Sequence, residues 1–231
     1  MSHSPTEISQ NTFYAAYDRS GQGTILKPKH CRQFYRDFVQ ISAFVNSMSV
    51  LELGCGNGLF LQYLQSLGVS DFTGVDSDPR VVAEMPANLA AHVQISDFRD
   101  FFETIQGRVF DRVVLFDVLE HFSPEDAVTL LRQIATVLAE DGRVVLRVPN
   151  MSSPLGMNVQ FNDVTHKTCF TPGSLRQVAK AADFSVLDFR PQAYSSWIRE
   201  MRERALTSLL SWFLSAPPAI WSPNFIGVLA K

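Results

Sequence analysis

Three glycines at alternate positions follow a short apolar run, and this stretch constrains the fold more than any other. Residues 50–60 read VLELGCGNGLF. Such a run is typical of a buried strand that enters a tight turn and then a helix. Glycine allows positive φ angles and lets the backbone approach a ligand without interference from a Cβ atom. The stretch therefore predicts a strand–turn–helix unit with a ligand bound over the turn.

The spacing of the glycines separates two kinds of nucleotide-binding turn. The dinucleotide fingerprint G-x-G-x-x-G directs a helix N-terminus at a pyrophosphate. Here Gly58 comes one residue too early, and Glu52 precedes Gly54 by two positions. A carboxylate at that place repels a pyrophosphate and attracts an ammonium group. The turn therefore favours a ligand with an amino-acid head over NAD.

The pattern acid-x-Gly-x-Gly-x-Gly, formed by Glu52, Gly54, Gly56 and Gly58, resembles the cofactor turn of class I S-adenosylmethionine (SAM)-dependent methyltransferases. This resemblance implies SAM as the cofactor. It also implies a Rossmann-like, seven-stranded, mostly parallel sheet with helices on both faces and an antiparallel last strand. The alternation of strand and helix patterns after the turn independently indicates an α/β fold.

Hydrophobic periodicity places the remaining elements. Strands are expected near residues 49–53, 71–76, 91–95, 109–116, 143–148, 184–190 and 224–230. Helices are expected near residues 11–19, 30–45, 58–67, 79–84, 124–139 and 172–182. We expect residues 1–48 to form a tail with lid helices and residues 49–231 to form the SAM-binding domain, with an acceptor-side insertion at about 150–172 and a helix at about 194–216.

Composition restricts the binding partners and the cellular location that we expect for the protein. The 231 residues include 23 acidic and 20 basic side chains, for a net charge of −3, so a nucleic-acid partner is not expected. Cys31, Cys55 and Cys169 are widely spaced, which favours neither a disulfide framework nor a zinc site. Residues 1–10 lack the pattern of a signal peptide. We therefore expect a cytoplasmic protein.

Acidic residues end the second and third predicted strands. Asp76 is expected to accept hydrogen bonds from ribose hydroxyls, because ligands of open α/β sheets bind at the carboxyl ends of strands. Asp78, directly before Pro79, is the alternative, although helix capping suits it better. By the resemblance, Asp97 accepts from the adenine amino group and the Phe98 N–H reaches a ring nitrogen. A plain turn aspartate is the alternative for Asp97.

The fourth predicted strand leads into the sequence DVLEHF at residues 117–122. By the resemblance, Phe116 and Asp117 border the sulfonium. His121 is either a base or a residue that pins its own loop, with Glu120 fixing its tautomer. A metal site formed by Asp117, Glu120 and His121 is disfavoured, because adjacent positions on one turn rarely converge on one ion. We therefore expect no metal.

A long insertion follows the fifth strand and contains the sequence FNDVTHKTCFTP at residues 161–172. It resembles a D-x-x-H-x-x-x-F-T segment of methyltransferases in lipid-quinone and glycan biosynthesis. Loops of this length in compact domains are usually functional. His166 is the candidate general base and Asp163 its orienting residue. The alternative is that both residues pin the loop.

Residues 194–216 carry apolar side chains at helical spacing, with arginines in the first half. This face suits burial on the domain, contact in a homodimer, or a membrane surface. Taken together, the sequence predicts transfer of a methyl group from SAM to an oxygen of a small-molecule, glycan-like or lipid-linked acceptor. The rival interpretations are a non-catalytic SAM-fold binding subunit and an NAD-dependent enzyme.

Overall fold

A single seven-stranded sheet organises the protein in the computed structural model, which describes residues 25–231 except 84, 106 and 195. The strand order is β3-β2-β1-β4-β5-β7-β6, and β7 runs antiparallel to both of its neighbours. The strands are β1 (Val50–Leu53), β2 (Phe72–Asp76), β3 (Val93–Ile95), β4 (Phe110–Phe116), β5 (Leu138–Pro149), β6 (Ser185–Pro191) and β7 (Asn224–Ala230). The predicted mostly parallel sheet with an antiparallel last strand is confirmed.

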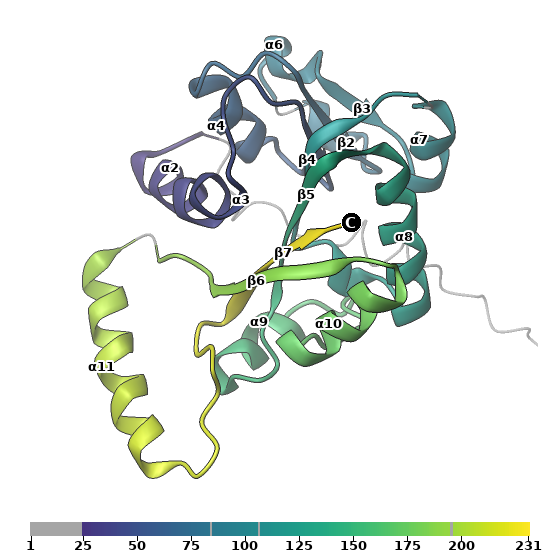
Figure 1. Cartoon of the computed structure of the whole chain (residues 1–231). Helices are drawn as coiled ribbons and strands as arrows, with labels where there is room; N and C mark the ends of the chain where they lie inside the picture. Colours follow the sequence, from purple (N-terminus) through teal and green to yellow (C-terminus); the bar gives the residue numbers. More distant parts are fainter. Residues whose placement is uncertain (1–24, 84, 106, 195) are drawn as a thin grey trace, which may run out of the picture.

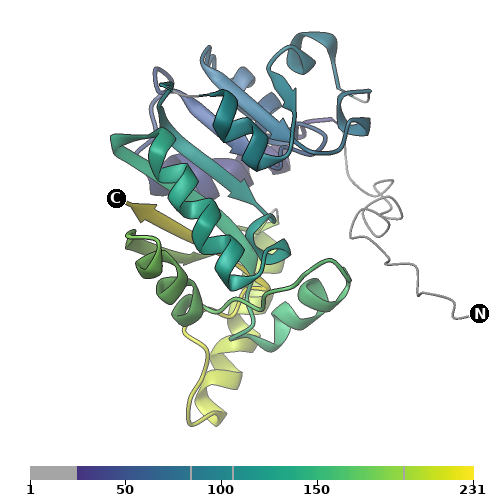
Figure 2. The same ribbon diagram turned by 90° about the vertical axis from the view of Figure 1, so that its right-hand side faces the viewer.

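Helices cover both faces of this sheet (Figure 1). One face carries α7 (Phe98–Thr104), α8 (Pro124–Val137) and α10 (Pro172–Ala181), and this side faces the viewer in Figure 2. The other face carries α4 (Leu59–Ser66) together with α2 (Pro28–Phe34), η1 (Tyr35–Val39) and α3 (Gln40–Ser42). Short helices α5 (Arg80–Ala83), α6 (Ala87–Ala90) and α9 (Met157–Phe161) and the 3-10 turns η2 (Leu119–His121) and η3 (Pro154–Gly156) lie in the connections between strands. Each face buries its own apolar cluster, which is the layered arrangement that a parallel sheet requires.

The first described helix differs from the single helix expected over residues 30–45. It begins at Pro28, passes through a π-helical turn at η1 and ends before Ala43, whose φ of 50° is left-handed. Phe34 packs against Phe60 and Phe116, with ring centroids 5.2 and 6.0 Å apart. This segment therefore covers the end of β4. The helix expected at residues 11–19 lies outside the described residues.

The fifth strand begins earlier than the sequence indicated. The expected helix 124–139 ends at Val137, and Leu138 already pairs with Phe110 of β4. A register shift between Phe110 and Arg112 accommodates the residues up to Arg143, where regular pairing resumes. The sequence pattern also missed α6, α7 and α9, which are short and carry few periodic positions.

The expected C-terminal helix forms as α11 (Trp197–Phe213) and extends away from the sheet in Figure 1. It contains no buried residue, so it does not pack into the domain core. Polar contacts fix its two ends: Arg36 of η1 makes a two-bond ion pair with Glu200, and Trp221 Nε1 donates to Ser211 Oγ at 3.0 Å. No helix among the described residues is both long and apolar enough to cross a bilayer.

Candidate active site

The glycine turn between β1 and α4 has the backbone that its sequence predicted. Gly54, Gly56 and Gly58 have φ angles of 71°, 51° and 73°. The N–H groups of Gly54 and Cys55 donate to the Val75 carbonyl, which ties the turn to β2. A Cβ atom on Gly54 would lie 2.5 Å from Val118 Cγ2, whereas one on Gly56 would meet no described atom within 4 Å. Val118 therefore packs against the turn at Gly54, while the backbone at Gly56 is accessible to a ligand.

Two carboxylates stand beside this turn at the carboxyl ends of β1 and β2. Asp76 accepts hydrogen bonds from the N–H groups of Gly56 and Asp78, at 2.8 and 2.9 Å. Glu52 is buried, and its Oε2 has no hydrogen-bond partner within the described part of the chain. Burial, and next the nearby Asp76, raise the Glu52 pKa well above its ordinary value, while Arg147 opposes the rise. A cation beside Glu52 would relieve this cost.

The third strand delivers Asp97 to the same sheet edge, because β1, β2 and β3 are parallel. Asp97 is exposed and caps α7 by accepting from the Arg99 N–H at 2.9 Å. Phe98 is the first residue of that helix. The capping contact uses one carboxylate oxygen and is compatible with a second partner.

Beyond β4, Asp117 adopts a φ of 59°, an uncommon conformation for a residue other than glycine. Its carboxylate pairs with the guanidinium of Arg147 on β5, with Nε and Oδ1 2.8 Å apart. The same guanidinium lies 4.8 Å from the centroid of the buried Phe116 ring. Sequence reasoning missed Arg147, although a charged residue inside the apolar run of β5 was a usable signal. Strain at Asp117 is thus held by an ion pair next to the predicted path of the methyl group.

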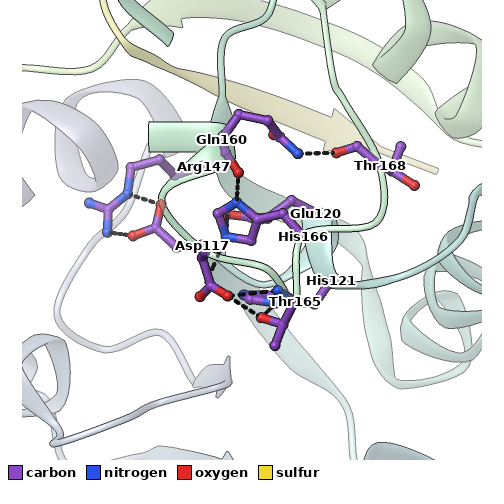
Figure 3. A network of polar contacts seen from close by, with 9 residues as sticks. Asp117, Glu120, His121, Arg147, Gln160, Thr165, His166 and Thr168 are labelled. Carbon is purple, nitrogen blue, oxygen red and sulfur yellow. Dashed lines mark hydrogen bonds and ion pairs between the residues drawn. The ribbon is translucent and has the colours of Figure 1, made fainter. Parts of the chain in front are cut away.

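Next along the loop, His121 is joined to the insertion by a chain of hydrogen bonds (Figure 3). His121 Nδ1 lies 2.9 Å from Thr165 Oγ1, and that hydroxyl donates to Asp163 Oδ1 at 2.6 Å. Since the Thr165 hydroxyl has one proton and gives it to Asp163, His121 Nδ1 must be the donor in the first contact. Asp163 therefore orients His121 through Thr165.

His166 lies beside His121, with ring centroids 4.7 Å apart and planes at 70°. Its Nδ1 donates to the Gln160 carbonyl at 2.9 Å, which leaves the lone pair on Nε2 in the neutral ring. His166 Nε2 lies 3.9 Å from Glu120 Oε1 and 4.0 Å from Asp163 Oδ2. Asp163 and His166 are thus too far apart for the expected hydrogen bond. The Gln160 carbonyl orients the His166 ring instead.

Backbone contacts join the two segments that carry these histidines. The Glu120 carbonyl accepts from the N–H groups of Lys167 and Thr168, at 2.8 and 3.0 Å. Thr168 Oγ1 donates to the Phe122 carbonyl at 2.6 Å. The structure therefore brings together all three acceptor-side residues that the sequence singled out, His121, Asp163 and His166.

Comparison with known proteins is consistent with this strand order and turn. A family model described as a methyltransferase domain matches residues 28–188. The chain belongs to the class I SAM-dependent methyltransferases. It has the fold of a SAM-dependent methyltransferase from Archaeoglobus fulgidus, with a TM-score of 0.71 and 18% identity over 95% of this chain and all of that one (100%). The cofactor of this methyltransferase is SAM, and an NAD-dependent activity is set aside.

Two relatives show how far the sequence similarity of this methyltransferase extends. It is 30% identical over 122 residues to a ribosomal protein L11 methyltransferase of Thermosipho africanus, and this match covers 52% of the chain and 44% of that protein. It is 23% identical over 200 residues to a ubiquinone biosynthesis O-methyltransferase of Xanthomonas campestris pv. campestris, covering 79% of the chain and 82% of that protein. The first match spans less than half of that relative.

The residues at the glycine turn of this methyltransferase fit SAM. The buried Glu52 Oε2, which lacks a protein partner among the described residues, suits the ammonium group of the amino-acid head. Gly58 has a φ of 73°, a conformation that favours glycine, and no described side chain covers the backbone at Gly56. These features suit a ligand with an ammonium group that lies directly on the turn.

Proposed function

We propose that this methyltransferase transfers the methyl group of SAM to a hydroxyl oxygen of a small-molecule, glycan-like or lipid-linked acceptor. The pair of histidines His121 and His166, beside Asp117 at the end of β4, is the observation that carries this proposal. SAM supplies a methyl group that is already activated on a sulfonium. The protein must therefore align the acceptor oxygen and remove its proton, and imidazole is suited to proton removal near neutral pH.

The cofactor side is assigned on the contacts of the glycine turn and the strand ends. In this proposal Glu52 binds the ammonium group, Gly54, Gly56 and Gly58 form the backbone cradle, and Asp76 accepts from the ribose hydroxyls. Asp97 and the Phe98 N–H bind the adenine edge, while Phe116 and Asp117 line the methyl group's path. The stacking of Phe34 on Phe116 supports a role for α2 as part of a lid.

On the acceptor side, His166 receives the proton through Nε2, the nitrogen left with a lone pair by the contact to the Gln160 carbonyl. Asp163 and His121 shape the same site through Thr165. Two apolar side chains of the insertion are largely exposed, Phe161 at 67% and Val164 at 75%. Exposed apolar groups beside polar catalytic groups support an acceptor that has an apolar part.

The proposal is tested with SAM carrying a labelled methyl group and with pairs of acceptors that differ only in one free or blocked hydroxyl. We expect label to enter only the free-hydroxyl member of each pair. His166→Ala should lower kcat by about 10²–10⁴-fold and leave the SAM Kd unchanged, because a general base contributes about that factor. His92→Ala, on a ring stacked against Phe72, is the matched control. Equal labelling of blocked acceptors contradicts transfer to oxygen.

A further inference from the structure

Three side chains that could bind a metal ion, one glutamate and two histidines, meet where the loop after β4 touches the insertion. Glu120, His121 and His166 each place one potential ligand atom within 4.8 Å of the other two. Glu120 and His121 come from η2 after β4, and His166 comes from the insertion after β5 (Figure 3). The sequence argued against an ion on residues 117–121 alone. Convergence is achieved instead by a ligand that lies far away in the chain.

Glu120 is the first reason to place a cation here. Its side chain is fully buried, at 0% exposure, and neither carboxylate oxygen has a hydrogen-bond partner among the described residues. A buried carboxylate with no donor is costly, and such groups in native proteins are paired or coordinate metals. The guanidinium of Arg147 is engaged with Asp117. His166 Nε2 lies 3.9 Å from Glu120 Oε1, which is too long for a hydrogen bond.

The orientation of the two histidines is the second reason. A metal-bound imidazole almost always donates its other ring N–H to a carbonyl or carboxylate, which fixes the tautomer. His166 Nδ1 donates to the Gln160 carbonyl, and His121 Nδ1 donates to Thr165, which donates to Asp163. Both rings therefore have their Nδ1 proton held by an outer partner, the arrangement that prepares Nε2 as a ligand.

We propose that Glu120, His121 and His166 bind one divalent transition-metal ion, of the type represented by Zn²⁺. Two imidazoles and one carboxylate suit Zn²⁺ and related ions, whereas Mg²⁺ and Ca²⁺ prefer sites made of oxygen alone. Ligand bonds of about 2.0–2.2 Å at a tetrahedral angle place two ligand atoms about 3.3–3.6 Å apart. The ligand atoms of the cluster lie within 4.8 Å of one another, so binding an ion requires inward side-chain movements of up to about 1.5 Å.

Three protein ligands leave at least one coordination position open. The use made of that position rests on the proposed function: the acceptor oxygen binds the ion and loses its proton to solvent water. The oxygen then forms the new bond to the methyl carbon as the carbon–sulfur bond breaks and its electron pair goes to sulfur. The bound ion lowers the pKa of the hydroxyl, so that solvent water takes the proton that His166 Nε2 takes in the metal-free enzyme.

Metal binding can be measured without any methyl acceptor. Chelator-treated enzyme is titrated with Zn²⁺ against a chromophoric competitor, and X-ray absorption of the loaded protein reports the ligand atoms. We expect one tight site per chain, with nitrogen and oxygen ligands at about 2.0–2.2 Å. Glu120→Gln and His166→Ala should each weaken Zn²⁺ binding more than 100-fold, while His92→Ala, which also removes one histidine, should not change it.

Thr165→Val keeps all three ligands and removes the acceptor that orients His121. We expect it to weaken Zn²⁺ binding by about 10–100-fold, the usual effect of losing an outer partner. This variant carries the test if either ligand variant fails to fold. Unchanged Zn²⁺ affinity in Glu120→Gln and His166→Ala, or in Thr165→Val, overturns the site.

The metal site and the proposed function can fail separately. If Zn²⁺ binds as expected but no hydroxyl acceptor is labelled, the site stands and transfer to oxygen is wrong. If hydroxyl acceptors are labelled at the same rate by chelated and Zn²⁺-loaded enzyme, transfer to oxygen stands and the ion has no part in it.

Discussion

The cofactor side and the acceptor side of this molecule are built by contacts of very different range. On the cofactor side, Asp97 accepts from the Arg99 N–H, two residues away, and Asp76 accepts from the N–H groups of Asp78 and Gly56, two and 20 residues away. On the acceptor side, the contacts between His121 and Thr165 and between Thr168 and Phe122 join residues 44 and 46 positions apart. The cofactor side is therefore organised by strand ends and turns. The acceptor side is organised by the packing of the insertion against the loop after β4.

This difference separates what the two halves can vary. In the proposed function, cofactor recognition depends on backbone groups and carboxylates at strand ends, which the sheet itself positions. Acceptor recognition would depend on an insertion whose side chains can change without disturbing the sheet. Substitutions on the two sides should therefore change stability, SAM binding and local hydrogen exchange in different ways. The following predictions test that separation.

The largest effect is expected for Gly54→Ala on the cofactor side. Its φ of 71° is unfavourable for alanine, and the added Cβ would lie 2.5 Å from Val118 Cγ2. Strain and overpacking together should cost about 2–5 kcal/mol of unfolding free energy and weaken SAM binding. Urea unfolding and calorimetry measure both. Gly68→Ala, at a φ of 78° and with no described atom within 4 Å of the added Cβ, is the matched control that isolates the clash.

Asn150→Ala should act on the acceptor side. This buried side chain donates to the carbonyls of Ile220 and Ser222, at 2.8 and 3.1 Å. Leaving these groups unpaired should cost about 2–4 kcal/mol. Hydrogen exchange should accelerate in residues 150–171 while β1 to β3 keep their protection. A uniform loss of protection over the whole sheet would show that the two sides are one cooperative unit.

Asp37 connects the N-terminal segment to the chain after β6, since its Oδ1 accepts from the Ala193 N–H at 2.8 Å. Burial raises its pKa from 3.8 to about 6. An acid with a raised native pKa holds its proton longer in the folded state, so stability falls as pH rises from about 4 to about 6.

Asp37→Asn removes this titration. Relative to the wild type, the variant should gain up to about 3 kcal/mol between pH 4 and pH 7, because each pKa unit corresponds to about 1.4 kcal/mol. Urea unfolding at several pH values measures the difference. Parallel stability curves for the two proteins would show that Asp37 is ionised without cost.

The smallest effect is expected for the ion pair that fixes the start of α11. Arg36 and Glu200 are joined by bonds of 2.8 and 3.0 Å, but the arginine side chain is 41% exposed. A double-mutant cycle with Arg36→Ala and Glu200→Ala should give a coupling energy below about 1 kcal/mol that falls at high salt. A larger coupling would mean that α11 is held to the domain as firmly as the core helices.

The sequence predicted most of the fold because its signals are local. The glycine turn, the acids at strand ends and the periodic pattern of the helix that begins at Pro124 each act within a few residues, and the structure has the expected elements there. Two boundaries were wrong where tertiary pairing prevailed over local preference: the fifth strand begins at Leu138, and the N-terminal helix contains a π turn.

The acceptor side was predictable in its residues but not in its arrangement. His121, Asp163 and His166 were identified from two short segments, yet nothing in their spacing indicated that the segments touch. The roles of Thr165 and Gln160 and the burial of Glu120 depend on how the two segments pack together. Neither segment's sequence alone contains a signal for them. The roles of these residues, and of the cofactor-side acids, stay predictions.

The position of β7 between β5 and β6 has a consequence for how the protein is made. During synthesis β7 emerges after the other six described strands, yet among the described strands β6 pairs only with β7. The same segment of chain, residues 220–223, supplies the carbonyls that hold Asn150 and Ser153 at the start of the insertion. Strands β1 to β4 therefore have their partners available on the ribosome well before the acceptor side does. A nascent chain stalled before residue 220 should contain the cofactor turn but lack an assembled acceptor site.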